Sequence, residues 1–188
     1  MMIYDLLDEL KNDLHELEPD ALEAKYHGMA EDEAGEKIAK QIADISVSDY
    51  QSDLCDALSQ AMEAADDEGC EAIVFEYDMD ADWAGWFYVC GDYAHEAVAD
   101  DDWADEHEEE LEGPVMKAFA KVHAKHGGLD ADEEDESSRG AVTLYLIART
   151  LACVSRAAEQ ARPEGLALCA CFTGQDALWR LREPHDED

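Results

Sequence analysis

Residues 72–90 read AIVFEYDMDADWAGWFYVC, the clearest interruption in a chain whose other segments mostly favour helices. The two ends of this stretch, 72–77 (AIVFEY) and 86–90 (WFYVC), are rich in β-branched and aromatic residues, which favour strands. An acidic run joins them, so the stretch predicts a β-hairpin with a long loop. Alternate residues of a strand lie on opposite faces of a sheet, and here both sets are largely apolar. We therefore expect helices to cover much of this hairpin.

Helical patterns occupy most of the remaining chain. Leucines recur three or four positions apart in residues 3–17, which predicts an amphipathic helix. Ser48 and Gln51 have the spacing of a capping box at the start of a helix over 48–68. Further elements are expected as helices at 31–45, 114–126 and 139–161, a strand at 166–172 and a terminal helix that ends near 182.

These elements predict the α+β class, with helices dominating the chain. The hairpin 71–90 and the strand 166–172 should form a small antiparallel sheet, packed against several helices. A chain of 188 residues of this kind fits one acidic domain, residues 1–188. We expect the acidic segments 99–112 and 129–136 to be solvated, exposed stretches between these elements.

The charge of the chain restricts the classes of partner. Against 49 Asp and Glu there are only 13 Lys and Arg, a formal net charge of -36. A surface of this sign repels nucleic acid and anionic membranes, and it attracts basic proteins. Adaptation to high salt would also explain the acidity, because salt screens self-repulsion. The seven Lys and six Cys of the chain argue against that alternative.

The amino-terminal residues and the cysteines point to the cytoplasm. The first residues lack a basic region followed by an apolar run, so no signal peptide is expected. No apolar stretch in the sequence resembles a membrane-spanning segment. The six cysteines show no framework spacing and lie in apolar segments, which is typical of buried, reduced thiols.

The hairpin loop carries the most specific local pattern, with carboxylates at the alternate positions Asp78, Asp80 and Asp82. Such carboxylates can converge on a Ca²⁺ or Mg²⁺ ion, so a cation-binding protein or a metal-dependent enzyme is an alternative function. The EF-hand pattern fails, because Trp83 stands where that loop needs glycine and Val89 where it needs glutamate. We find no catalytic motif and expect a protein that is not an enzyme, without a required cofactor.

Aromatic residues near acidic runs suggest a second kind of site. Residues 100–112 hold nine acids in thirteen positions and include Trp103. Tryptophans beside carboxylates are suited to bind basic side chains by cation–π and ionic contacts. Trp83 and Trp103 are the expected anchors. The carboxylates expected to bind the partner are Asp78, Asp80, Asp82, Asp100, Asp101, Asp102, Glu108 and Glu109.

The favoured hypothesis is therefore an acidic interaction protein that binds and neutralises a basic protein. Its most concrete form is a bacterial immunity protein, an antitoxin-type inhibitor of a nuclease-like toxin. In a related form the acidic surface imitates the phosphates of nucleic acid and occupies a DNA-binding groove. The charge alone indicates neither the partner's identity nor the oligomeric state.

Overall fold

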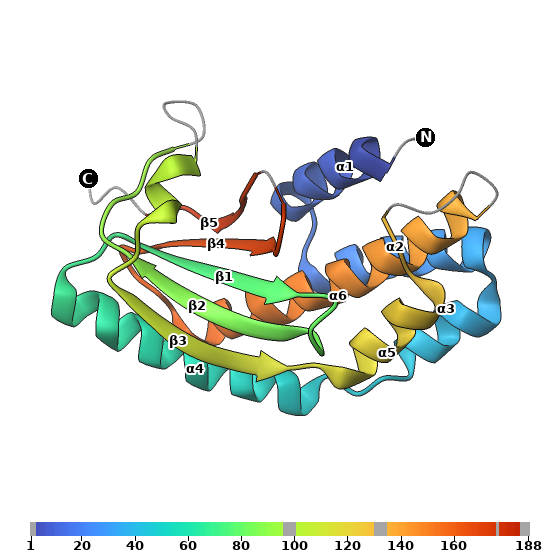
Figure 1. Ribbon diagram of the computed structural model, residues 1–188, viewed down its shortest axis with the longest axis horizontal. Coiled ribbons are helices and arrows are strands. Elements are labelled where there is room, and N and C mark those ends of the chain that lie inside the picture. The colour runs from blue at the N-terminus through green and yellow to red at the C-terminus, as the bar shows by residue number, and fades with distance from the viewer. Residues whose placement is uncertain (1–2, 96–100, 130–134, 176, 185–188) are drawn as a thin grey trace.

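A computed structural model describes residues 3–95, 101–129, 135–175 and 177–184 of the chain (Figure 1). Within these residues the chain forms six α-helices, one 3-10 helix and five strands. The elements are, in chain order, α1 (Ile3–Glu16), α2 (Pro19–Ala34), α3 (Glu36–Ala43), α4 (Ser48–Glu68), β1 (Ala72–Asp78), β2 (Ala84–Cys90), η1 (Asp101–Asp105), β3 (Glu109–Val115), α5 (Lys117–His126), α6 (Glu136–Ala161), β4 (Ala167–Phe172) and β5 (Trp179–Arg182).

The predicted hairpin is confirmed. β1 and β2 pair antiparallel, with Phe75 opposite Phe87 and Tyr77 opposite Gly85. Ile73, Phe75, Tyr77 and Phe87 point to the main core, where the rings of Phe75 and Phe87 lie 4.9 Å apart. The period of two along each strand thus places the largest apolar side chains on one face of the sheet.

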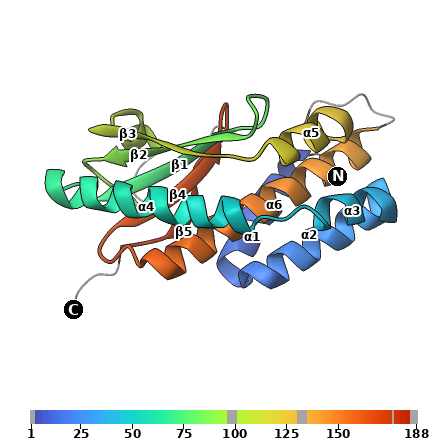
Figure 2. The ribbon, with the colours of Figure 1, turned by 90° about the horizontal axis from the view of Figure 1, so that it is seen from below.

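The expectation of a small antiparallel sheet is wrong, although the α+β class with dominant helices holds. The sheet has five strands in the order β3-β2-β1-β4-β5, and β1 and β4 run parallel. α4 leads into β1 and α6 leads into β4, and both helices lie on the same face of the sheet (Figure 2). α4 and α6 both end at the end of the sheet where β1 and β4 begin (Figure 1). The two strands therefore start side by side and run in the same direction.

Two segments expected to lie outside the sheet are its edge strands. β3 occupies part of the acidic segment 99–112, and β5 replaces the predicted terminal helix. β5 pairs antiparallel with β4, and its first residue, Trp179, is only 2% exposed. Pairing with the sheet and burial of this indole override the local preference for a helix. On β3, glutamates and Pro114 protect the free edge from pairing with other chains.

The long helix α6 lies at the centre of the core. Residues Gly140 to Val154 are all buried, so this part of the helix is enclosed around its whole circumference. Its length and hydropathy satisfy a test for a membrane-spanning helix, but 89% of that window is buried inside the protein. Burial against the other helices and the sheet accounts for its composition.

The first helices differ in detail from the prediction. The pattern over 31–45 belongs to the end of α2 and to α3, because Gly35 with a φ of 92° breaks the helix between them. α4 has the predicted bounds, but its amino terminus carries no side-chain capping hydrogen bond. The hydroxyl of Ser48 is instead 2.9 Å from that of Ser46.

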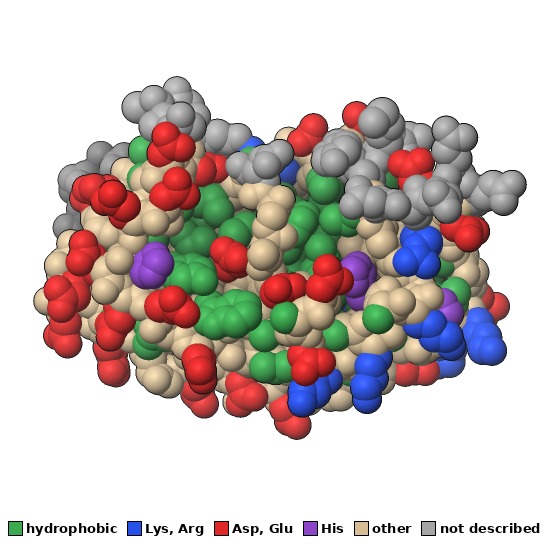
Figure 3. Space-filling model, viewed as in Figure 1, with side chains coloured by type: hydrophobic (Ala, Val, Ile, Leu, Met, Phe, Trp, Pro, Cys, Tyr) green, Lys and Arg blue, Asp and Glu red, His purple; other side chains and the backbone are tan. Residues whose placement is uncertain are grey.

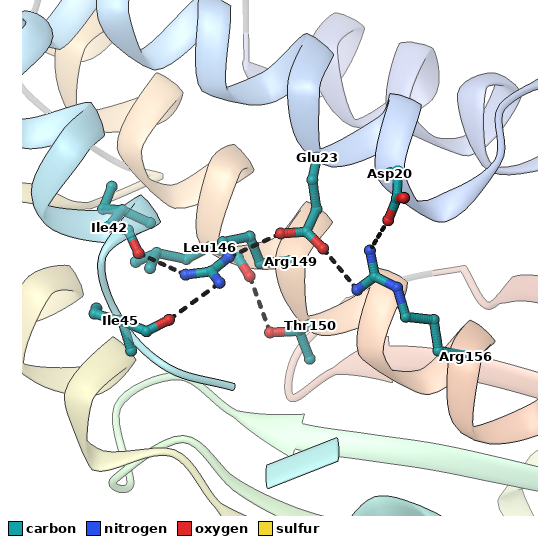
Figure 4. A network of polar contacts seen from close by, with 8 residues as sticks. All are labelled: Asp20, Glu23, Ile42, Ile45, Leu146, Arg149, Thr150 and Arg156. Carbon is teal, nitrogen blue, oxygen red and sulfur yellow. Dashed lines mark hydrogen bonds and ion pairs between the residues drawn. The ribbon is translucent and has the colours of Figure 1, made fainter. Parts of the chain in front are cut away.

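One buried cation joins α6 to α2 and to the end of α3 (Figure 4). The guanidinium of Arg149, a residue only 6% exposed, donates to Glu23 at 2.9 Å and to the carbonyl oxygens of Ile42 and Ile45. Arg156 donates to the other carboxylate oxygen of Glu23 at 2.7 Å. Buried charge is tolerated only when it is paired and hydrogen-bonded, and Arg149 meets both conditions.

Candidate functional site

The face of the sheet opposite α4 and α6 is only partly covered. Directly paired residues share a face, and Trp86 is paired with Glu76 on one side and Glu112 on the other. Tyr88 is paired with Glu110 in the same way. We call these five side chains, Glu76, Trp86, Tyr88, Glu110 and Glu112, the open face. Apolar side chains lie between acidic ones on this side of the molecule (Figure 3).

The neighbouring part of the same sheet surface is covered by the segment around η1. There Tyr93 and Trp103, whose rings meet edge to face at 5.1 Å, pack on a second apolar cluster. This cluster includes Val74 of β1 and Cys169 of β4, which are paired in register. η1 lies at one end of the sheet (Figure 1), and Tyr88 of the open face packs against the same second apolar cluster as Tyr93 and Trp103.

The open face is electrostatically negative and partly apolar. Burial raises the pKa of the Tyr88 hydroxyl, and the nearby charges of Glu76 and Glu110 raise it further. The ring of His107 lies 4.8 Å from that of Tyr88 and extends the aromatic surface. No Lys or Arg occurs anywhere in residues 41–116, which include β1, β2 and β3. A cation placed over Trp86 and Tyr88 would therefore meet the carboxylates of three strands that carry no Lys or Arg.

The prediction that Trp83 is an exposed anchor is wrong. Its side chain is fully buried, its indole Nε1 donates to Oγ1 of Thr150 at 3.0 Å, and it stacks on Tyr77 at 5.5 Å. Asp82 and Trp83 have φ values of 58° and 56°. This left-handed turn of the hairpin brings the indole back onto α6, where it fills the core.

The three loop carboxylates do not converge as a metal site requires. Oδ1 of Asp78 accepts from the backbone N–H groups of Asp80 and Ala81 at 2.8 and 3.1 Å, which holds the turn. Asp82 faces Lys117 at 3.9 Å, and Asp80 lies 3.8 Å from Nδ1 of His123. In the parts of the chain that the structure describes, no group of three potential ligands is close enough to hold a metal ion. The geometry thus gives the Ca²⁺ or Mg²⁺ alternative no support.

The predicted acidic residues around η1 separate into two kinds. Asp101 pairs with Arg180 at 2.7 Å and accepts from the backbone N–H of Leu178 at 2.9 Å, so it holds η1 to β5. Asp102, Glu108 and Glu109 are exposed, and Asp100 lies outside the described residues.

Trp103 packs within the protein and does not stand free in an acidic surface. It is half-buried on the second apolar cluster beside Tyr93. Its indole Nε1 is buried without a hydrogen-bond partner among the described residues.

The sequence interpretation missed all five residues of the open face. Alternation within each strand was the available signal, because Trp86 and Tyr88 share one face and Phe87 and Val89 the other. Which face stays uncovered depends on the packing of α4 and α6. Comparisons of the chain with protein-family models, curated proteins and solved structures find no significant match. The open face and its charge therefore carry the functional interpretation.

Proposed function

We propose that the protein binds a basic protein partner through the open face. The observation that carries this proposal is the juxtaposition of Trp86 and Tyr88 with Glu76, Glu110 and Glu112 on an uncovered sheet surface. Lys or Arg side chains of the partner would lie over the two rings and pair with the carboxylates. The exposed Asp102, Glu108 and Glu109 would extend the negative surface beside it.

The physical chemistry of these groups favours a cationic partner. A cation–π contact contributes about 0.5–1 kcal/mol at an exposed site and about 2 kcal/mol when desolvated. Charge-assisted hydrogen bonds are about twice as strong as neutral ones. The net charge of -36 would also steer a basic protein toward the complex and accelerate association at low salt.

The most concrete partner is a basic, nuclease-like toxin, with this protein as its immunity-type inhibitor. A nuclease active site must attract phosphates, so it presents the positive charge that the open face would neutralise. Binding of carboxylates and rings in that groove would exclude nucleic acid from it.

The test is a binding titration with a Lys/Arg-rich peptide, followed by amide shifts in NMR spectra. We expect the shifted amides to lie in β2 and β3, with affinity that falls steeply with salt. A triple variant, E76Q/E110Q/E112Q, should bind at least about tenfold more weakly, a loss of about 1.4 kcal/mol.

The matched control is D53N/D56N/E63Q, which removes the same charge from the exposed side of α4. This control should bind nearly as tightly as the natural chain. Equal weakening in the two variants would mean that only the total charge matters, and the proposed site would be wrong. A neutral peptide of the same length, with Gln in place of Lys and Arg, should not bind.

A further inference from the structure

A pocket of about 870 Å³ lies beside the ends of β1 and β4. Its apolar lining includes Leu7 of α1, Met79 after β1, Phe172 of β4 and Trp179 of β5. Small-molecule sites usually measure about 300–1,000 Å³ and combine an apolar lining with a few polar groups. The size and composition of this pocket fall in that class.

The position of the pocket follows from the parallel strand pair. β1 and β4 both end at the pocket, which is lined by Asp80 from the turn after β1 and by Thr173 and Gln175 after β4. Crevices at the carboxyl ends of parallel strands are the usual ligand sites of sheets with helical crossovers. In Figure 1 both arrowheads point toward the helical half of the molecule.

Arg139, in the first turns of α6, lines this pocket without a carboxylate partner. Across residues 3–95, 101–129, 135–175 and 177–184, no carboxylate lies within 4.0 Å of its guanidinium. Arg149, Arg156 and Arg180 all have one. In so acidic a chain, an arginine left unpaired inside a pocket indicates a site for an external anion.

Gly127 and Gly128 have no side chain, which leaves room for the side chains of His123 and Arg139 to pack closely against the backbone. A Cβ at Gly128 would lie 3.0 Å from Nε of Arg139, and one at Gly127 would lie 2.5 Å from Cδ2 of His123. His123 is 9% exposed, and its Nε2 has no hydrogen-bond partner within the described parts of the chain. Burial lowers the pKa of this imidazole, although Asp80 opposes the shift.

The other charged groups that line the pocket are Asp8 and Lys11 of α1 and Asp80 of the hairpin turn. Both signs of charge are therefore present around Arg139.

We propose that this pocket binds a small organic anion, whose acid group pairs with Arg139 and whose apolar body packs on Met79, Phe172 and Trp179. The planar guanidinium is suited to a carboxylate or similar oxyacid group, because it can donate two parallel hydrogen bonds. The pocket and the open face share no lining residue, and one hydrogen bond of 2.7 Å joins them, from Oγ1 of Thr173 to Oε1 of Glu76.

The test uses anilinonaphthalene sulfonate, a fluorescent organic anion with an apolar body. We expect one saturable site on the natural chain. R139Q should bind the probe at least about tenfold more weakly, because the charged partner is lost. The matched control K121Q removes the same charge from the exposed surface of α5 and should bind it unchanged. Benzoate should compete with the probe, and benzamide, which lacks the charge, should not.

A second measurement needs no variant. A bound anion stabilises the imidazolium form, so saturation with the probe should raise the pKa of His123 in an NMR titration. Near-UV circular dichroism checks that R139Q keeps its fold. Unchanged binding by R139Q, equal competition by benzamide, or an unmoved His123 pKa would each overturn the proposal.

Discussion

Two arginines of α6, Arg149 and Arg139, show opposite uses of the same side chain. Arg149 is buried and donates to Glu23 and to the carbonyl groups of Ile42 and Ile45, so all of its partners lie within the protein. Arg139 lies at the pocket, and no carboxylate of the described chain pairs with it. A satisfied cation holds helices together, whereas an unsatisfied one is available to a ligand.

The largest effect expected from this comparison is on stability. R149M removes the guanidinium donor from the Ile45 carbonyl and from one oxygen of Glu23, and leaves the Ile42 carbonyl only the backbone N–H of Ile45. It should lower the free energy of unfolding by about 3–5 kcal/mol. R139Q removes no ion pair with the described residues and should change the free energy of unfolding by less than about 0.5 kcal/mol. Urea unfolding monitored by circular dichroism measures both. Similar losses in the two variants would show that Arg139 also holds the fold.

The tryptophans of the hairpin extend the comparison to aromatic residues. W83A should lose about 3–5 kcal/mol, because it opens a cavity and leaves Oγ1 of Thr150 without its indole donor. W86A, on the open face, should lose roughly 1 kcal/mol or less. The effects on affinity for the basic peptide should have the opposite order. W86A should weaken peptide binding, whereas W83F, a milder change than W83A, should leave it unchanged. If W86A binds the peptide normally, the open face is not the binding surface.

The smallest effect concerns pH. Since burial lowers the pKa of His123 in the folded state, the unfolded chain binds more protons between that value and about 6.5. The contribution of His123 to stability is therefore complete above about pH 6.5 and decreases as the pH falls toward its folded pKa. The loss on acidification from neutral pH should be smaller in H123Q than in the natural chain, as measured by urea unfolding at a series of pH values. An identical pH profile would show that His123 is not held in its neutral form.

Much of the fold could be predicted because the decisive patterns are local. The hairpin of β1 and β2 and the helices α1, α4 and α6 follow from periodicity over neighbouring residues. β5 could not be found in this way, because its strand state depends on pairing with β4 and on burial of Trp179. β3 could not be predicted for a related reason. Its glutamate-rich sequence is typical of a solvated loop, and its strand state depends on pairing with β2.

The chemical composition of the candidate site could be predicted from the sequence, but the residues that form it could not. The sequence indicated carboxylates beside aromatic residues, which is also the composition of the open face. It assigned the role to Trp83 and Trp103, whereas the half-buried aromatic residues of the open face are Trp86 and Tyr88. A left-handed turn buries Trp83, and the cluster beneath η1 holds Trp103.

By itself the sequence determined the sign of the surface, the dominance of helices and the presence of the hairpin, since each depends on composition or on neighbouring residues. Only the tertiary structure decided which strands run parallel, which sheet face stays open and which arginine at the pocket has no carboxylate partner among the described residues. These properties depend on contacts between residues far apart in the chain. Glu23 reaches Arg149, for example, only because α2 packs on α6.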